Sequence, residues 1–426
     1  MATVPMTDEE CRIATAALMP KIERYAELVV RKGVAVQPGQ EILLSAPVER
    51  ADFARILVRK AYEAGAGHVT VVWSDDEVGR LEYENCPLEY FEHTPGWKKE
   101  QLNSLAEMGA GFLFVEGSDP NALKGIDPAK PAAAVLARST ECKPFREGME
   151  FGRNAWCIAG APVAAWAKKV FPKLSEAEAV YRLWEAILDV AHASGPDPMG
   201  EWERHDATFE KNKRFLNGKR FDALHYTASN GTDLTVGLNP GGLWDGGSGT
   251  TTGGVKYFPN IPTEEVFTTP DRTRADGIVK SAMPLVHAGQ IVRDFWFRFE
   301  GGAVVDYGAV EGKDVLRSIL ETDENAVRLG ECALISKNTP IRQRSILFYD
   351  TLYDENASCH LAIGMGFPEC LEGGLEMDKD QLLAANVNQS HTHVDFMIGT
   401  DDLNVDGITA DGEVVPVFVN GQWAWE

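Results

Sequence analysis

The sequence lacks the features that define several classes of protein. It has an odd number of cysteines and no Cys-x-x-Cys pair, which argues against a disulfide framework or a thiolate zinc site and favours a reducing compartment. No apolar run approaches the roughly eighteen residues that a membrane helix needs. The opening segment MATVPMTDEECRIA has neither the basic nor the apolar region of a secretion signal. We therefore expect a soluble, cytoplasmic protein. The cysteines are Cys11, Cys86, Cys142, Cys157, Cys332, Cys359 and Cys370.

Positive charge is also scarce, above all in the second half of the chain. The formal net charge is -23, residues 216–426 carry 15 basic against 31 acidic side chains, and no Lys or Arg follows Lys379. Nucleic acid is therefore an unexpected partner, because phosphate binding depends on clustered basic residues. The negative field favours cations, such as a metal ion or the ammonium group of a peptide. A surface that is acidic only for solubility is the alternative.

The 426 residues predict two domains, 1–215 and 216–426. In the first, Thr7 and Glu10 form a capping box for a helix over residues 7–34. The segments EILLSAPV, ARILVRKAYEAG and HVTVVW then alternate as strand, helix and strand, and GFLFVEG is a later strand. Ser175 begins a further helix, and helical character continues to about Gly218. This order predicts an α/β domain with a largely parallel sheet.

The second half has the pattern of a β-rich, mixed α/β domain. HYTASNGTDLTVGL and IVRDFWFRFEGGAVVDYGAV each contain two alternating strands around a glycine turn, which is typical of hairpins. The glycine-dense stretch 239–260 lacks the Gly-Lys-Ser/Thr element of a phosphate loop. We interpret it as a loop packed closely against other backbone.

Two short segments carry candidate metal ligands. In QSHTHVDFMIG, a strand would place His391, His393 and Asp395 on one face. In YDENASCHLAIG, Asp354 or Asn356 could cap a helix whose inward face includes His360. A polar outer strand face and a buried core histidine are the respective alternatives.

Two acidic residues are further candidate metal ligands. Glu265 in NIPTEEVFTTP and Glu331 in LGECALI each lie beside an apolar, strand-like run that would bury the carboxylate. Each could instead be a surface acid. Taken with the two histidines and the aspartate, they make an oxygen and nitrogen donor set without thiolate, which suits two bridged divalent ions that polarise a carbonyl and activate water.

The segments NIPTEEVFTTP, LGECALI, YDENASCHLAIG and HVDFMIG, in this order, resemble the metal-site motifs of the metallo-aminopeptidase family that includes aminopeptidases T and S. The resemblance implies a homodimer with a two-metal centre, holding cobalt or zinc, that releases N-terminal residues from peptides. Manganese or magnesium is a further option. The metal ligands that it implies are Glu265, Glu331, His360, His393 and Asp395.

Two positions near these motifs leave the chemistry open. The family has a tyrosine seven residues after the histidine of YDENASCHLAIG, where this chain has Phe367, so Tyr349 or Tyr353 could take over its role. Glu264, next to a ligand, is our candidate for the general base, with a solvent-facing neighbour as the alternative. The alternative functions are a mononuclear iron(II) ring-cleaving dioxygenase and a catalytically inactive metal-binding homologue.

Overall fold

The described residues of the computed structural model, 6–287 and 290–426, divide into two units. The first comprises Met1–Asp206, Ser248–Thr263 and Leu347–Tyr349, and the second Ala207–Gly247, Glu264–Ile346 and Asp350–Glu426. The change from one to the other first occurs within helix α10 (Pro198–Lys219). The domain boundary that we place at residue 216 stays a prediction, and the signal-segment prediction falls partly on residues 1–5, outside the described residues.

The first unit is an α/β fold, as its sequence predicts. A capping box between Thr7 and Glu10 begins its first helix, and Ser175 caps the last. Its elements are α1 (Asp8–Leu28), a π-helical turn (Val29–Gly33), β1 (Glu41–Pro47), a 3-10 turn (Val48–Arg50), α2 (Ala51–Glu63), β2 (His68–Ser74), α3 (Asp76–Asn85), α4 (Leu88–Phe91), α5 (Gly96–Glu107), β3 (Gly111–Glu116), α6 (Ala129–Glu141), α7 (Lys143–Glu150), β4 (Trp156–Gly160), α8 (Ala164–Val170), α9 (Glu176–Val190), β7 (Gly249–Thr250), β8 (Lys256–Tyr257) and β9 (Asn260–Ile261).

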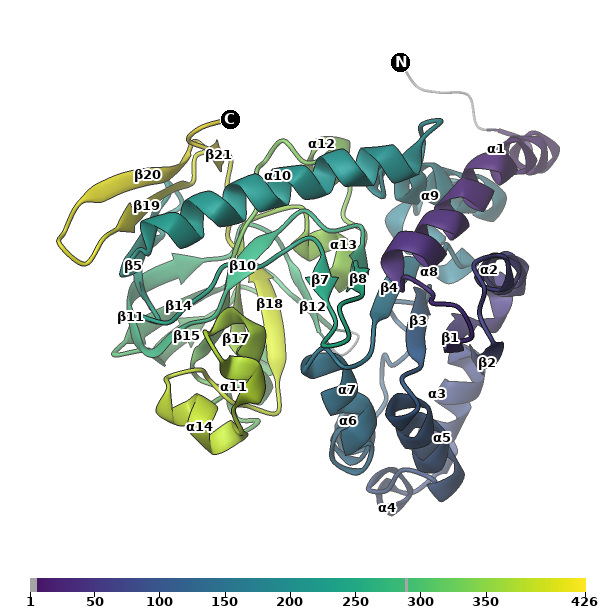
Figure 1. Cartoon of the computed structure of the whole chain (residues 1–426), viewed down its shortest axis with the longest axis horizontal. Coiled ribbons are helices and arrows are strands. Elements are labelled where there is room, and N and C mark those ends of the chain that lie inside the picture. The colour runs from purple at the N-terminus through teal and green to yellow at the C-terminus, as the bar shows by residue number, and fades with distance from the viewer. Residues whose placement is uncertain (1–5, 288–289) are drawn as a thin grey trace. The chain divides into compact units, whose positions relative to one another are not determined.

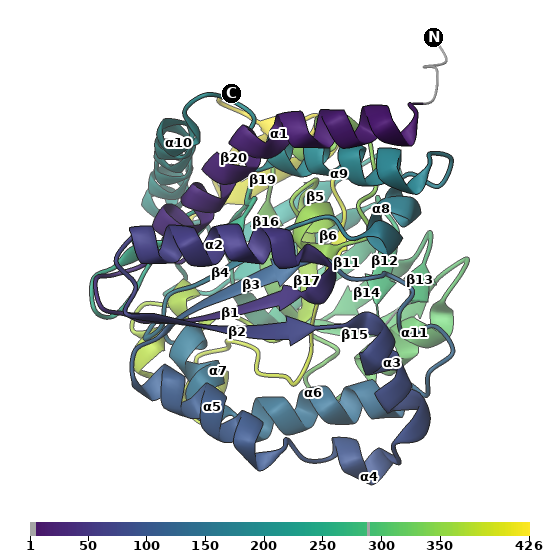
Figure 2. The ribbon, with the colours of Figure 1, turned by 90° about the vertical axis from the view of Figure 1, so that its right-hand side faces the viewer.

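A parallel five-stranded sheet forms the centre of this unit, in the order β2-β1-β3-β4-β9. Figure 2 shows α1 and α2 over one face of the sheet and α5, α6 and α7 on the other. Phe112 of β3 packs against Phe145 of α7, with ring centroids 4.8 Å apart. Because helices cover both faces, the strands are apolar along most of their length.

The second unit is β-rich, as predicted, and its sheets are antiparallel. Its elements are β5 (Ala223–Thr227), β6 (Asp233–Leu238), β10 (Val266–Thr268), β11 (Pro270–Lys280), β12 (Leu285–His287), β13 (Gln290–Val292), β14 (Trp296–Glu300), β15 (Ala303–Gly308), α11 (Lys313–Leu320), β16 (Leu329–Leu334), α12 (Pro340–Arg344), α13 (Thr351–Glu355), β17 (His360–Gly364), 3-10 turns at Pro368–Cys370 and Gly374–Glu376, α14 (Lys379–Ala384), β18 (His393–Met397), β19 (Asn404–Ile408), β20 (Val414–Val419) and β21 (Gln422–Trp423). Both predicted hairpins form, as β5-β6 and β14-β15.

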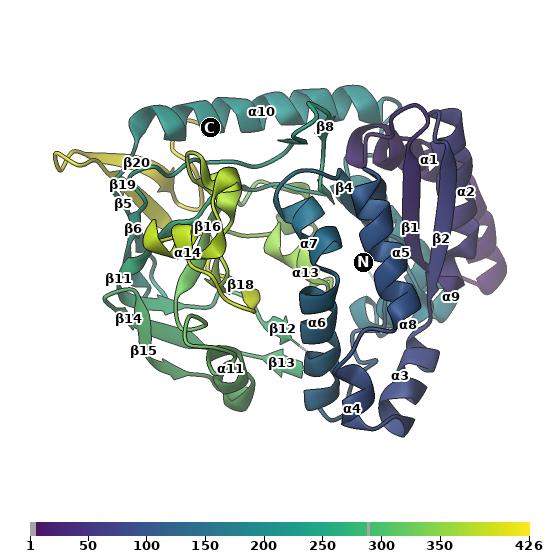
Figure 3. The same cartoon turned by 60° about the horizontal axis from the view of Figure 1, so that its bottom comes forward.

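Two sheets of this unit pack face to face. One has eight strands in the order β15-β14-β11-β6-β5-β19-β20-β21, and Figure 3 shows β15 to β20 in this sequence. The β19-β20 pair is the yellow ribbon near the C-terminus in Figure 1. The other sheet has four strands, β10-β16-β17-β18. Phe297 and Phe299 from the large sheet share one buried core with Leu361, Ile363 and Phe396 from the small sheet.

The helix predicted through His360 is wrong. The helical turn α13 ends at Glu355, and residues His360–Gly364 form β17, a central strand between β16 and β18. A short apolar run fits both periods, and sheet pairing decides in favour of the strand. Leu361 and Ile363 face the core, while His360 takes the opposite face.

Within the described residues, no helix combines the length and the apolar character that crossing a membrane would require.

Candidate metal centre

Five polar side chains converge on the face of the four-stranded sheet that points away from the core. Strands β16, β17 and β18 alternate between core residues and this outer face, and Glu331, His360, His393 and Asp395 all lie on the outer side. Glu265 immediately precedes β10, the remaining strand of the sheet. These are the five residues singled out from the sequence, so the structure brings all of them together.

The register of the sheet explains why two carboxylates can face each other. Glu331 of β16 pairs with Ala362 of β17, and Ala362 pairs with Asp395 of β18. Ala362 is fully buried and its side chain is a single methyl group. This small residue allows Glu331 and Asp395 to approach the same imidazole nitrogen, Nε2 of His393.

The side-chain atoms lie within a few ångströms of one another. The Nε2 atom of His360 is 3.4 Å from Glu265 Oε2, 4.0 Å from Glu331 Oε1 and 4.0 Å from Asp395 Oδ1. The Nε2 atom of His393 is 3.1 Å from both Glu331 Oε2 and Asp395 Oδ1. Candidate ligand atoms therefore form two triads, Glu265-Glu331-His360 and Glu331-His393-Asp395, each within 4.8 Å, and Glu331 belongs to both.

Backbone carbonyls fix the orientation of both imidazoles. His360 Nδ1 lies 3.2 Å from the carbonyl oxygens of Glu355 and Ser358, and His393 Nδ1 lies 2.8 Å from that of Met365. A proton on each Nδ1 satisfies these contacts and places Nε2 on the side of the carboxylates, where it would be available to a metal ion. Histidine ligands of metal ions are commonly held in this way.

The carboxylates repel one another in a site removed from water. Burial, and then the charge of Glu331, raise the pKa of Glu265 to about 8. Burial by itself would lower the pKa of His360, but Glu331, Glu265 and Asp395 outweigh it and raise that pKa. Burial would raise the pKa of Asp395, and His393 more than compensates and lowers it. Such a concentration of negative charge favours a bound cation.

The donor set therefore fits divalent metal ions. It offers carboxylate oxygens and imidazole nitrogens with no thiolate, and four of its five members sit on paired strands, while Glu265 lies directly before β10. Mixed nitrogen and oxygen donors suit such an ion better than they suit a purely oxygen-seeking ion such as calcium.

The backbone around Glu265 is held from two sides. The N–H of Glu264 donates to Asn356 Oδ1 at 2.7 Å, and Asn356 is fully buried. On the other side Gly246 adopts a φ of 140°, and an added Cβ there would lie 2.3 Å from the carbonyl oxygen of Glu265. The close approach at Gly246 agrees with the prediction that the glycine-dense stretch packs against other backbone.

Glu355 and Ala362 were not identified from the sequence. The pKa of Glu355 is raised well above its usual value, first by removal from water and then by Asp395, Glu265 and Glu331, so its carboxyl group lies in the field of the cluster. Once β17 is recognised as a strand, the alternation of its side chains places Ala362 on the same face as His360, between Glu331 and Asp395. Glu355 has no comparable signal, because α13 brings it to the site through tertiary packing.

Other candidates lie outside the five-residue cluster. His391 is exposed and precedes β18, so the predicted three-residue strand face is wrong: Asp323 accepts the N–H of His391 at 2.7 Å and holds a turn there. Tyr353 is fully buried on α13. Tyr349 belongs to the first unit, where Lys169 lies over its ring.

Phe367 lies beside the cluster. Its ring centroid is 4.9 Å from that of His393, at an interplanar angle of 52°. Its backbone N–H donates to Thr269 Oγ1 at 2.8 Å. The side chain thus contacts a candidate ligand from a fixed position, although it has no hydroxyl group with which to bind a metal or donate a hydrogen bond.

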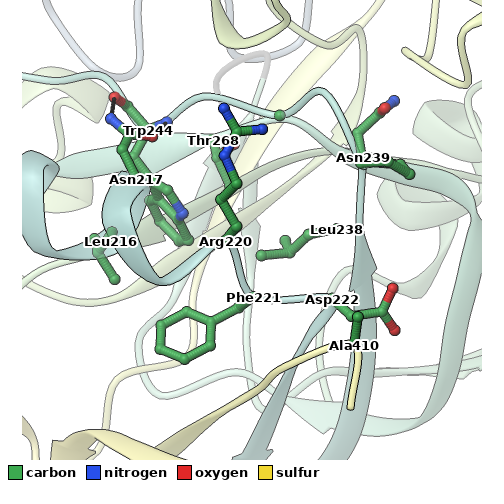
Figure 4. A pocket seen from close by; sticks show the side chains of 12 residues that line it. Leu216, Asn217, Arg220, Phe221, Asp222, Leu238, Asn239, Trp244, Thr268 and Ala410 are labelled. Atoms are coloured by element: carbon green, nitrogen blue, oxygen red, sulfur yellow. Dashed lines mark hydrogen bonds between the residues drawn. The ribbon is translucent and has the colours of Figure 1, made fainter. Parts of the chain in front are cut away.

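A separate cavity of 180 Å³ lies near the end of α10 (Figure 4). Its walls include Arg220, Asp222 and Thr268, and two hydrogen bonds join Asn217 to Trp244 on one side. Among the described residues that line it, none belongs to the five-residue cluster. Thr268 and Phe267 point to opposite faces of β10, so this strand separates the cavity from the cluster.

Comparison with known proteins gives a consistent result over the full length of the chain. The family described as thermophilic metalloprotease (M29) matches residues 18–423. The chain is 44% identical to aminopeptidase AmpS of Bacillus subtilis, over 95% of this chain and 98% of that protein. It is 42% identical to aminopeptidase T of Thermus aquaticus, over 96% and 99%. The solved structure of wild-type AmpT from Thermus thermophilus overlays with a TM-score of 0.89 at 41% identity, covering 96% of this chain and 100% of that one.

Proposed function

Because this chain belongs to the thermophilic metalloprotease family M29 and is a metal-dependent aminopeptidase, we propose that Glu265, Glu331, His360, His393 and Asp395 hold its divalent ions. The two triads that share Glu331 are the observation that carries this proposal. Two ions per chain would fit these triads, and Glu331 would belong to both donor sets. The family match and the aminopeptidase relatives favour peptide hydrolysis over the ring-cleaving dioxygenase and the inactive homologue.

In the proposed centre, the metal ions, the carboxylates and the histidines have different roles. Divalent ions in such a site supply Lewis acidity to a peptide carbonyl and lower the pKa of water. The chain's carboxylates hold the ions and attract the ammonium group of a peptide, and the two histidines, anchored through Nδ1, keep the donor geometry fixed. The substrates are peptides with a free N-terminus.

Two carboxylates outside the ligand set could accept the proton of the attacking water. Glu264 is adjacent to Glu265, and Asn356 fixes its backbone. Glu355 ends α13, and its carboxyl group lies in the field of three of the proposed ligands. A base beside the reacting water commonly accelerates such a reaction about 10² to 10⁴-fold.

We further propose cobalt or zinc as the working metal, with manganese or magnesium as substitutes, and a cytoplasmic homodimer as the working form. The mixed nitrogen and oxygen donors support the first proposal. The dimer and the compartment come from the family resemblance and the absence of paired cysteines. Light scattering of the purified protein tests the dimer directly.

The central test is metal-dependent hydrolysis of leucine 4-nitroanilide. Protein stripped with a chelator should lose activity and regain it when cobalt, zinc, manganese or magnesium is added singly. His360→Ala should abolish the restored activity and lower the metal content, because it removes a member of one triad. His391→Ala is the matched control, since this exposed histidine lies outside the cluster. Full activity in the His360 variant would contradict the ligand assignment.

A further inference from the structure

An apolar surface adjoins the candidate metal centre. The rings of Phe267 and Phe367 meet edge to face, with centroids 5.4 Å apart and an interplanar angle of 68°. Phe367 also contacts His393 at 4.9 Å. Both phenylalanines are half-buried. The two rings therefore form a continuous apolar surface that begins at a proposed metal ligand.

The sheet places Phe267 on the same face as the cluster. Phe267 pairs with Ala333 of β16, and Ala333 pairs with His360 of β17. Directly opposite residues in antiparallel strands share a face, so Phe267, Ala333 and His360 form one row. Between Phe267 and His360, Ala333 contributes only a methyl group.

The backbone of Phe367 is held in place by two hydrogen bonds. Thr269, which is almost fully buried, accepts the N–H of Phe367 at 2.8 Å and donates to its carbonyl oxygen at 3.3 Å. At Gly366, an added Cβ would lie 2.6 Å from Thr269 Cγ2, so glycine permits this close approach. A fixed apolar surface loses little conformational freedom when a ligand packs on it.

We propose that Phe267 and Phe367 form the apolar wall of the subsite that receives the side chain of the substrate's N-terminal residue. An aminopeptidase must bring the first peptide carbonyl to its metal centre, so the first side chain lies within a few bonds of the cluster. The wall begins at His393 and has no hydrogen-bonding group. It selects large apolar side chains, such as leucine and phenylalanine, over alanine and over acidic residues, which the surrounding carboxylates also repel.

This inference rests on the proposed ligand set, and it differs from a purely structural role for the two rings. If Phe367 only steadied His393, its loss would lower turnover of every substrate together and reduce the metal content. A wall that determines specificity instead changes the ratio of kcat/KM between large and small substrates. A loss of activity that affects both substrates equally leaves this ratio unchanged.

The test measures kcat/KM for the 4-nitroanilides of leucine, phenylalanine, alanine and glutamate. Wild type should prefer leucine and phenylalanine. Phe367→Ala and Phe267→Ala should each lower the leucine-to-alanine ratio about tenfold, which is the scale at which apolar pockets discriminate. Phe367→Leu, which keeps an apolar side chain, should retain more of the ratio. Phe215→Ala is the matched control, since this half-buried ring packs on Trp425.

Two further measurements separate the possible outcomes. Calorimetry should show weaker binding of the product leucine to both alanine variants at an unchanged metal content, with alanine binding little altered. An unchanged leucine-to-alanine ratio in both variants would overturn the wall, as would a uniform loss accompanied by metal loss. A wrong ligand set would give a different result: the wild type would be active without metal, or the His360→Ala variant would keep full activity.

Discussion

The side-chain oxygen of Asn356 accepts a hydrogen bond from the backbone N–H of Glu264 at 2.7 Å, and its amide nitrogen donates to the carbonyl of Leu352 at 2.8 Å. Asn356 is fully buried and thereby joins α13 to the segment that carries Glu265. A residue outside the ligand set therefore determines where one of the proposed ligands lies.

Asn356→Ala should lower metal affinity and activity together. The change removes both hydrogen bonds that the Asn356 amide makes, and each such bond contributes about 0.5 to 1.5 kcal/mol. Metal titration and kcat/KM provide the measurements, and Asn356→Asp, which keeps the acceptor, should be less impaired. Asn85→Ala is the matched control, because the exposed Asn85 makes the same bond to the carbonyl four residues earlier. Unchanged metal affinity in the alanine variant would refute the positioning role.

Ala362→Leu should abolish metal binding in folded protein. The larger side chain would fill the space between Glu331 and Asp395, which lie on either side of Ala362 in the sheet. Metal content after gel filtration is the measurement. Ala275→Leu, a similar enlargement in the core of the large sheet, should lower the melting temperature yet leave the metal content of the folded protein intact. Equal metal content in the two variants would contradict this account of Ala362.

Glu264→Gln and Glu355→Gln distinguish the two candidate bases. Glutamine keeps the size of the side chain and removes the group that accepts a proton. The variant that loses the base should keep its metal and lose about 10² to 10⁴-fold in kcat. The other should stay close to wild type. If both variants keep full activity, neither carboxylate is the base.

The sequence predicted which five residues cluster, but not the residues that position them. Four recognisable segments that contain histidine, aspartate and glutamate identify His360 and Glu331. This identification depends on residue type and motif, so it holds although the helix expected around His360 is a strand. Ala362 depends on the pairing register, and Asn356 on packing between segments more than ninety residues apart. Local periodicity indicates neither the pairing register nor the packing of distant segments, so only the structure identifies these two residues.

Removal of metal should destabilise the wild type because the carboxylates then repel one another without a counter-ion. A metal present at about 100 times its Kd stabilises the folded chain by about 2.7 kcal/mol, and chelation removes this contribution. Glu331→Gln deletes one of the repelling charges, and Glu331 is the residue common to both triads. We therefore expect calorimetry to show opposite effects: with chelator, the variant should melt above the wild type, and with metal it should melt below. A variant that melts below the wild type in both conditions would show that Glu331 stabilises the fold independently of metal, and the charge argument would then fail.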